Sequence, residues 1–175
     1  SGMIGSRQGW REAPYAECPA GARDLAGKLV SVTSPLGQEA WLVPGVMRTD
    51  DDGVPDVMRG EETQIVGCLT EGDPPRRLFV LPGTHSKWAI VEAGRITRFA
   101  TFMTGELFAL LRGHGILGRL MEGDQHDPAA FRRGVEYGSR AGGGLLKRLF
   151  SVRTLALFER LPPSGVASYL SGLLI

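Results

Sequence analysis

The polar segment Gly83 to Lys87 carries the side chains of this sequence best suited to chemistry. A glycine is followed by a hydroxyl, an imidazole, a second hydroxyl and an amine: Gly83, Thr84, His85, Ser86 and Lys87. Backbone N–H groups in such a turn can surround an anion, and a lysine adds positive charge. The segment is not a P-loop, because no G-x-x-x-x-G-K-[ST] occurs in the chain. An ordinary hairpin with a polar tip explains the same residues, so the pattern alone leaves both interpretations open.

Two adjacent acids, Glu61 and Glu62, form a second candidate group. They follow Gly60 at the start of a predicted helix. Negative side chains there offset the helix dipole, which is a sufficient structural explanation. Alternatively, one of them projects into a cleft, where it acts as a general base or holds a metal-bound water.

The glycine-rich segment at the N-terminal end holds the third candidate group, Ser6, Arg7 and Gln8. A guanidinium, an amide and a hydroxyl can together bind a carboxylate or sugar hydroxyls. A flexible chain terminus is the competing explanation. The acidic run 50–52 is expected to be solvated, and we assign no metal ligand from the protein.

Alternating and apolar runs predict the strands and helices that would position these groups. Strands are predicted at 29–33, 39–43 with an extension at 46–47, 78–81, 88–91 and 96–102. Helices are predicted from Gly60, from Thr104 as N-cap, from Asp127 and Pro128, over 145–160, and after Ser164. The expected class is therefore α/β, with mixed sheets of the α+β kind.

A charged, proline-containing linker divides the predicted elements. We place it at 73–77, between an N-terminal part at 1–72 and a C-terminal part at 78–175. The earlier part carries the loop of Ser6 to Gln8 and the Glu-Glu helix. The later part begins with the hairpin around the polar turn.

Composition excludes several function classes. The 175 residues are 42% hydrophobic and 22% charged, as in ordinary globular proteins, and the net charge is +1. There is thus no electrostatic case for nucleic acid or an anionic membrane. The apolar segment 161–175 is too short and interrupted to span a bilayer, and residues 1–10 do not resemble a signal peptide. The expected location is the cytoplasm, and self-association into a homo-oligomer is left open.

Three motifs and the C-terminal segment resemble one family. These are GMIGSRQGW at 2–10, MRGEETQ at 58–64, LPGTHSKW at 81–88 and SYLSGLLI at 168–175. Together they are similar to the 2-dehydro-3-deoxygalactonokinase family. The order of a Glu-Glu helix, a linker and a hairpin with a Gly-Thr turn resembles the wider actin-like ATPase and sugar-kinase superfamily.

The resemblance implies a ribonuclease H-like, actin-like two-lobe kinase fold, which we expect to be incomplete at both ends of this chain. It implies ATP-dependent phosphorylation of 2-dehydro-3-deoxy-D-galactonate at the 6-hydroxyl, in D-galactonate catabolism. ATP and Mg²⁺ are the implied cofactors, and the sugar acid and ATP the implied partners. The implied sites are phosphate binding by Gly83, Thr84, His85, Ser86 and Lys87, catalysis by Glu61 or Glu62, and substrate binding by Ser6, Arg7 and Gln8.

One departure from the superfamily pattern keeps alternatives open. Family members carry an acidic-x-Gly-Thr loop for phosphate and Mg²⁺, and this sequence contains no D-x-G-T. A phosphatase-type hydrolase of the same superfamily is one alternative. A non-catalytic fragment that binds the sugar acid is the other.

Overall fold

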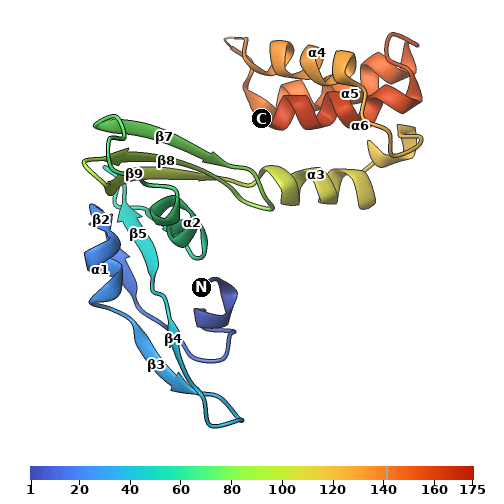
Figure 1. The fold of residues 1–175 in the computed structure, drawn as a ribbon. Coiled ribbons are helices and arrows are strands. Elements are labelled where there is room, and N and C mark those ends of the chain that lie inside the picture. The colour runs from blue at the N-terminus through green and yellow to red at the C-terminus, as the bar shows by residue number, and fades with distance from the viewer. Residues whose placement is uncertain (141) are drawn as a thin grey trace. The chain divides into compact units, whose positions relative to one another are not determined.

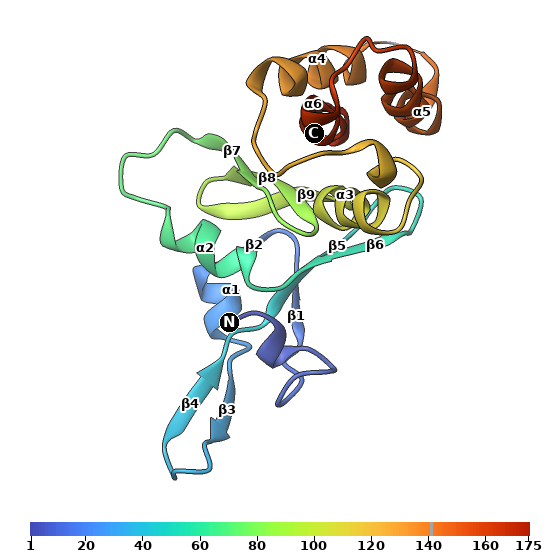
Figure 2. The ribbon, with the colours of Figure 1, turned by 90° about the vertical axis from the view of Figure 1, so that its right-hand side faces the viewer.

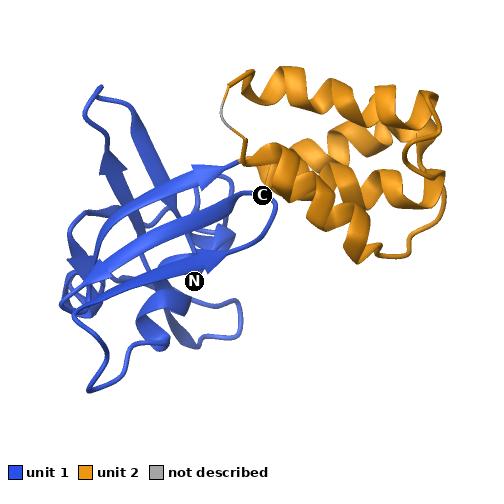
Figure 3. Ribbon diagram, turned by 90° about the horizontal axis from the view of Figure 1, so that it is seen from above, with its two compact units in different colours: residues 1–102 blue, residues 103–175 orange. Residues whose placement is uncertain are grey.

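The computed structural model describes residues 1–140 and 142–175, which form two compact units, Ser1–Phe102 and Met103–Ile175 (Figure 3). Unit 1 contains all of the described strands and the short helices η1, α1 and α2, whereas unit 2 is helical. The α/β class, predicted from the strand and helix patterns, is confirmed, with several sheets of which one is mixed.

Three sheets build unit 1 (Figure 1). The first has the order β1-β5-β6, formed by Tyr15–Glu17, Gly45–Thr49 and Pro55–Met58, with β1 parallel to β5 and β6 antiparallel to it. The second has the order β2-β9-β8-β7, all antiparallel, formed by Ala20–Gly21, Arg95–Phe102, Ser86–Glu92 and Arg76–Leu81. The third is the hairpin of β3 (Val30–Thr33) and β4 (Glu39–Leu42), which extends away from the rest of unit 1 (Figures 1 and 2).

One apolar core joins the first two sheets to the helices of unit 1. It includes Val46 and Met58 from the first sheet, Phe99 from the second, Leu25 from α1 (Ala22–Ala26) and Ile65 from α2 (Glu61–Gly67). Because α2 is anchored by Ile65, its first turn is fixed relative to both sheets. The three-residue 3-10 helix η1 (Met3–Gly5) precedes the loop of Ser6 to Gln8.

The predicted strands around the polar turn and the helix from Gly60 are confirmed, with three local differences. The residues Ser86 and Lys87 belong to β8, so the turn is shorter than predicted. The run 46–47 is part of a separate strand, β5, because Pro44 interrupts the ladder that β4 forms with β3. Strand β6 follows β5 directly after the acidic turn and pairs with it in antiparallel fashion. It was not predicted, because its four residues, Pro55–Met58, include a proline and an aspartate instead of an apolar run.

Unit 2 packs its helices around an apolar core. The helices are α3 (Thr104–Gly113), η2 (Gly118–Leu120), α4 (Pro128–Gly138), α5 (Gly144–Leu157) and α6 (Pro163–Leu174). The core contains Val152, Val166, Tyr169 and Leu170. Glycine allows α4 and α6 to approach closely, because a Cβ on Gly172 would lie only 2.1 Å from the Phe131 carbonyl oxygen.

The helices predicted for unit 2 are present, with shifted ends. Asp127 caps α4 as predicted, its Oδ1 accepting the N–H of Ala129 at 2.9 Å and of Ala130 at 3.0 Å. Met103, not Thr104, is the N-cap of α3. Helix α5 ends at Leu157 instead of residue 160, and α6 starts at Pro163, so Ser164 lies inside it.

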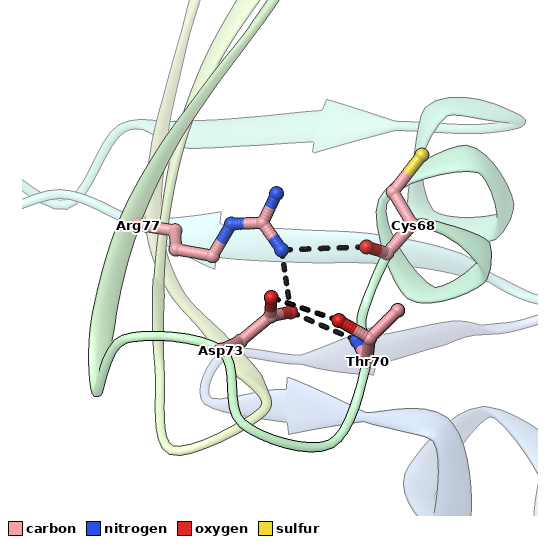
Figure 4. A network of polar contacts seen from close by, with 4 residues as sticks. All are labelled: Cys68, Thr70, Asp73 and Arg77. Atoms are coloured by element: carbon pink, nitrogen blue, oxygen red, sulfur yellow. Dashed lines mark hydrogen bonds and ion pairs between the residues drawn. The ribbon is translucent and has the colours of Figure 1, made fainter.

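Hydrogen bonds and an ion pair fix the conformation of the predicted linker at 73–77 (Figure 4). Asp73 accepts the backbone N–H and the hydroxyl of Thr70, at 2.8 and 2.9 Å, and forms an ion pair with Arg77. Arg77 also donates to the Cys68 carbonyl at 3.3 Å, so the end of α2 is connected to β7. The hydrogen bond from the Thr70 N–H is the main cause that lowers the pKa of Asp73. The segment lies within unit 1, and its role as a lobe boundary stays a prediction.

Within the described residues, no helix has the length and hydrophobicity needed to cross a bilayer.

Candidate functional site

The three candidate groups of the sequence line one cavity in unit 1. Its volume is about 740 Å³. Residues come from the N-terminal loop, from the start of α2 and from the β7–β8 turn, and they include Ser6, Arg7, Gln8, Arg59, Glu61, Gly83, Thr84, His85 and Lys87. Glu62 and Ser86 are not among the lining residues. These segments are far apart in sequence, so the fold is what brings their side chains together.

In the N-terminal loop, burial separates Ser6 from its neighbours. Ser6 is only 7% exposed, and its hydroxyl has no hydrogen-bond partner among the described residues. The side chain of Arg7 is 85% exposed and lies 3.8 Å from the Glu12 carboxylate, while Gln8 is exposed. Ser6 is therefore fixed in the cavity wall, whereas Arg7 and Gln8 lie at its solvent side.

The start of α2 is shaped by Gly60 and Glu62. Gly60 has a φ angle of +116°, a backbone conformation that residues other than glycine rarely adopt. Glu62 is 0% exposed and accepts the Gly60 N–H at 2.5 Å and the Thr63 hydroxyl at 3.0 Å. Burial raises the pKa of Glu62, although these hydrogen bonds act in the opposite direction. The geometry shows Glu62 holding the first turn of α2 in place.

Glu61 takes a different direction from its neighbour. One of its carboxylate oxygens accepts the Arg59 N–H at 3.1 Å, and the side chain lines the cavity. Burial lowers the pKa of Lys87, and the negative charge of Glu61 opposes that shift, so the two groups interact electrostatically. Of the two predicted catalytic glutamates, Glu61 is thus the one placed to meet a bound molecule.

The β7–β8 turn exposes the backbone of the predicted phosphate-binding residues. Gly83, Thr84 and His85 are exposed and line the cavity. Ser86 is buried, and its Oγ accepts the Gly83 N–H at 3.4 Å. A Cβ on Gly83 would have no neighbour nearer than 3.9 Å, so the protein itself does not require glycine there.

Lys87 is buried and held by two strands. Its Nζ donates to the Val57 carbonyl of β6 at 2.7 Å and to the Thr101 hydroxyl of β9 at 2.8 Å. Thr101 in turn donates to the Asp56 carboxylate at 2.5 Å. Burial lowers the pKa of Lys87, whereas Glu61 and Asp56 act to raise it. An ammonium has three N–H donors, so one is left for a ligand in the cavity that Lys87 lines.

Arg59 is a cavity residue that the sequence analysis missed. Its guanidinium lies over the Tyr15 ring, 4.3 Å from the centroid, and its Nη2 donates to the Ala13 carbonyl at 2.8 Å. Its Nε and Nη1 are buried without a partner among the described residues. Such groups are rare, because leaving a buried donor unpaired costs about 1–3 kcal/mol and more when it is charged. The sequence feature that could have indicated Arg59 as a site residue is its position just before Gly60 and the two glutamates.

Comparison with known proteins identifies the family of the chain. The family model described as 2-keto-3-deoxy-galactonokinase matches residues 1–175. The chain belongs to this family. Its sequence is 39% identical over 175 residues to the 2-dehydro-3-deoxygalactonokinase of Escherichia coli. It is 38% identical over 177 aligned positions, covering 99% of this chain, to a candidate 2-dehydro-3-deoxygalactonokinase of Rhizobium meliloti.

A solved structure of the 2-keto-3-deoxy-galactonokinase type is also similar. The crystal structure of a candidate 2-dehydro-3-deoxygalactonokinase from Sinorhizobium meliloti has a TM-score of 0.89 and 37% identity, and covers 98% of this chain. The chain spans 57% of the length of each of these relatives.

No group of three or more His, Cys, Asp or Glu side chains in the described part of this family member is arranged to hold a metal ion. The cavity does contain the carboxylates of Glu12 and Glu61. Mg²⁺ is commonly held by one or two carboxylates, waters and the phosphates of a nucleotide. The two carboxylates therefore fit a Mg²⁺ ion that would bind together with the phosphates of a nucleotide.

Proposed function

We propose that this chain contributes the sugar-acid and phosphate-binding part of an ATP-dependent kinase acting on 2-dehydro-3-deoxy-D-galactonate. The observation that carries the proposal is the shared cavity, which joins the loop of Ser6 to Gln8, Glu61 and the turn of Gly83 to His85. Family membership supports it, since the family description names a kinase of this sugar acid. The relatives carry kinase names, which favours transfer to an alcohol over hydrolysis.

In the proposed reaction, Glu61 orients the 6-hydroxyl of the sugar acid and accepts its proton. The hydroxyl oxygen forms a bond to the γ-phosphorus as the bond to the β-phosphate oxygen breaks, so ADP leaves. The N–H groups of Gly83, Thr84 and His85 surround the transferred phosphate, and Lys87 adds positive charge. Ser86 supports this turn through its contact with the Gly83 N–H. Bound Mg²⁺ neutralises phosphate charge.

At the other end, the sugar acid meets the N-terminal loop. Ser6 is buried in the wall, and Arg7 and Gln8 reach the ligand from the exposed side. Glu62, whose role we separate from that of Glu61, acts by fixing the first turn of α2. We therefore propose Glu61 as the base, a choice that the sequence left open.

We also propose the finer fold assignment. The order of Glu-Glu helix, linker and hairpin supports an actin-like, ribonuclease H-like two-lobe fold, with parts 1–72 and 78–175 and the connection 73–77. In a cytoplasmic sugar-acid kinase of this type, ATP would bind between the lobes. A ligand-dependent change in the angle between these parts, measured by solution scattering on a protein of the relatives' length, would test the assignment.

The test of function is a chimera in which residues 1–175 replace the matching segment of the Escherichia coli relative. Phosphorylation of the sugar acid is followed by ³¹P NMR, which separates a sugar phosphate from free phosphate. We expect the chimera to form the sugar phosphate, and Glu61→Gln to lower its turnover at least a hundredfold. The matched control is Glu71→Gln, because Glu71 is exposed and lies outside the cavity; this variant should keep the turnover of the chimera. A folded chimera that releases only free phosphate would show a hydrolase, and one with no turnover would refute the proposal.

A further inference from the structure

We infer that Arg59 and Ser6 form an oxyanion site that receives the carboxylate of the sugar acid. The family resemblance implied this role for Arg7 and Gln8. The identity of the ligand rests on the proposed function, whereas the oxyanion site rests on the geometry of the cavity.

Arg59 is held in place before any ligand binds. Its guanidinium is stacked on Tyr15 at 4.3 Å and bonded to the Ala13 carbonyl at 2.8 Å. The Nε and Nη1 groups have no acceptor among the described residues, although both are buried. A guanidinium forms its strongest hydrogen bonds with oxyanions, so an anion in the cavity would satisfy donors that the protein leaves unpaired.

Ser6 provides an independent second donor. Its hydroxyl is buried and lacks a partner among the described residues, and Ser6 lines the same cavity as Arg59. The two are close in space, because Nη1 of Arg59 lies 3.3 Å from the position of a Cβ on Gly5, the residue before Ser6. A hydroxyl and a guanidinium on neighbouring segments of one cavity wall are suited to one small anion.

Arg7 is less suited to the same task. Its side chain is 85% exposed and has only a 3.8 Å approach to Glu12. An exposed arginine must lose side-chain freedom when it binds, whereas Arg59 is already ordered by Tyr15 and Ala13. We therefore assign the orienting contact to Arg59.

The position of the buried cation Lys87 favours a carboxylate over a phosphate at Arg59. Lys87 lies at the end of the turn that begins at Gly83, and Glu61 influences its pKa. The phosphate and the reacting hydroxyl thus belong near Lys87 and Glu61. A substrate that carries a carboxylate at one end and accepts a phosphate at the other needs a second cation, which Arg59 supplies.

The test follows the arginine Nε–H resonances of the 175-residue chain by NMR. The probes are 2-dehydro-3-deoxy-D-galactonate, its neutral carboxamide, and inorganic phosphate. We expect the sugar acid to shift the Arg59 Nε–H signal, and the carboxamide and phosphate to leave it unchanged at equal concentration. By calorimetry, Arg59→Lys should weaken sugar-acid binding about tenfold to a hundredfold. Arg23→Lys, an exposed change outside the cavity, should not.

The outcomes separate this inference from the proposed function. If the sugar acid shifts Arg7 and not Arg59, or shifts neither, the carboxylate assignment is wrong whatever the chimera does. If phosphate shifts Arg59 as strongly as the sugar acid does, the oxyanion site belongs to the nucleotide. If Arg59 responds to the sugar acid but the chimera transfers no phosphate, the site stands and the kinase proposal fails. The wild-type signal is informative even if Arg59→Lys does not fold.

Discussion

Replacing Glu62 by alanine should destabilise unit 1 much more than replacing Glu61. Glu62 is 0% exposed and is the acceptor for the Gly60 N–H, whereas Glu61 is only partly buried and water can replace its contact. An unpaired buried N–H costs about 1–3 kcal/mol. Loss of the acid from the first helical turn adds roughly 0.3–1 kcal/mol. Relief from burying a carboxylate opposes both effects. We expect about 2–3 kcal/mol for Glu62→Ala and about 1 kcal/mol or less for Glu61→Ala.

Tryptophan fluorescence during urea unfolding at neutral pH measures this difference. All three tryptophans, Trp10, Trp41 and Trp88, lie in unit 1, so the signal reports the unit that contains both glutamates. Glu62→Gln keeps an acceptor oxygen for the Gly60 N–H and should cost less than Glu62→Ala. Equal losses for Glu61→Ala and Glu62→Ala would refute the separation of a structural glutamate from a cavity glutamate.

The pH dependence of the same variants provides a second test. Burial raises the pKa of Glu62 in the folded protein above its value of about 4.3 in an unfolded chain. The folded state therefore binds the Glu62 proton more tightly than the unfolded chain does. The stability that this proton contributes is fully present below the unfolded pKa and is lost as pH rises through the folded pKa. The stability of wild type relative to Glu62→Gln should fall over that interval. A stability difference between wild type and Glu62→Gln that rises with pH would contradict a raised pKa for Glu62.

Three further predictions concern the turn, the helical unit and the segment 73–77. Gly83→Ala should change stability by less than about 1 kcal/mol, because a Cβ there has open space, yet it should weaken Mg·ATP binding in calorimetry by obstructing the phosphates. Gly172→Ala should lower the stability of unit 2 by about 1–3 kcal/mol, because the Cβ of the alanine would clash with the Phe131 carbonyl oxygen. Circular dichroism during thermal unfolding measures that loss of stability. Asp73→Asn should destabilise the protein at neutral pH but not at low pH, because the Thr70 N–H lowers the Asp73 pKa and that stability is lost as pH falls through the folded value.

Local patterns were sufficient to predict the elements around the site. The short apolar runs 78–81 and 88–91 predicted β7 and β8, and apolar residues at helical spacing after Gly60 predicted α2. Strands β1 and β6 were missed, because each is only three or four residues long. In addition, β1 pairs with β5, which lies far from it in the sequence.

The candidate site residues show a similar division. Residue type and family resemblance identified Lys87 and the glutamates, but only the fold reveals that Lys87 is held by Val57 and Thr101. Arg59 could not be recognised, because its stacking on Tyr15 and its unpaired donors depend on tertiary contacts that no spacing encodes. The contrast between buried Glu62 and cavity-lining Glu61 has the same origin.

Calorimetric titration of this chain with 2-dehydro-3-deoxy-D-galactonate tests the central claim most directly, which is that the unit 1 cavity binds the sugar acid. We predict one site per chain for the wild type and loss of binding in Ser6→Trp, whose side chain would project into the cavity. The absence of binding heat at millimolar concentrations over several temperatures, with a chain whose tryptophan fluorescence shows it to be folded, would contradict the claim.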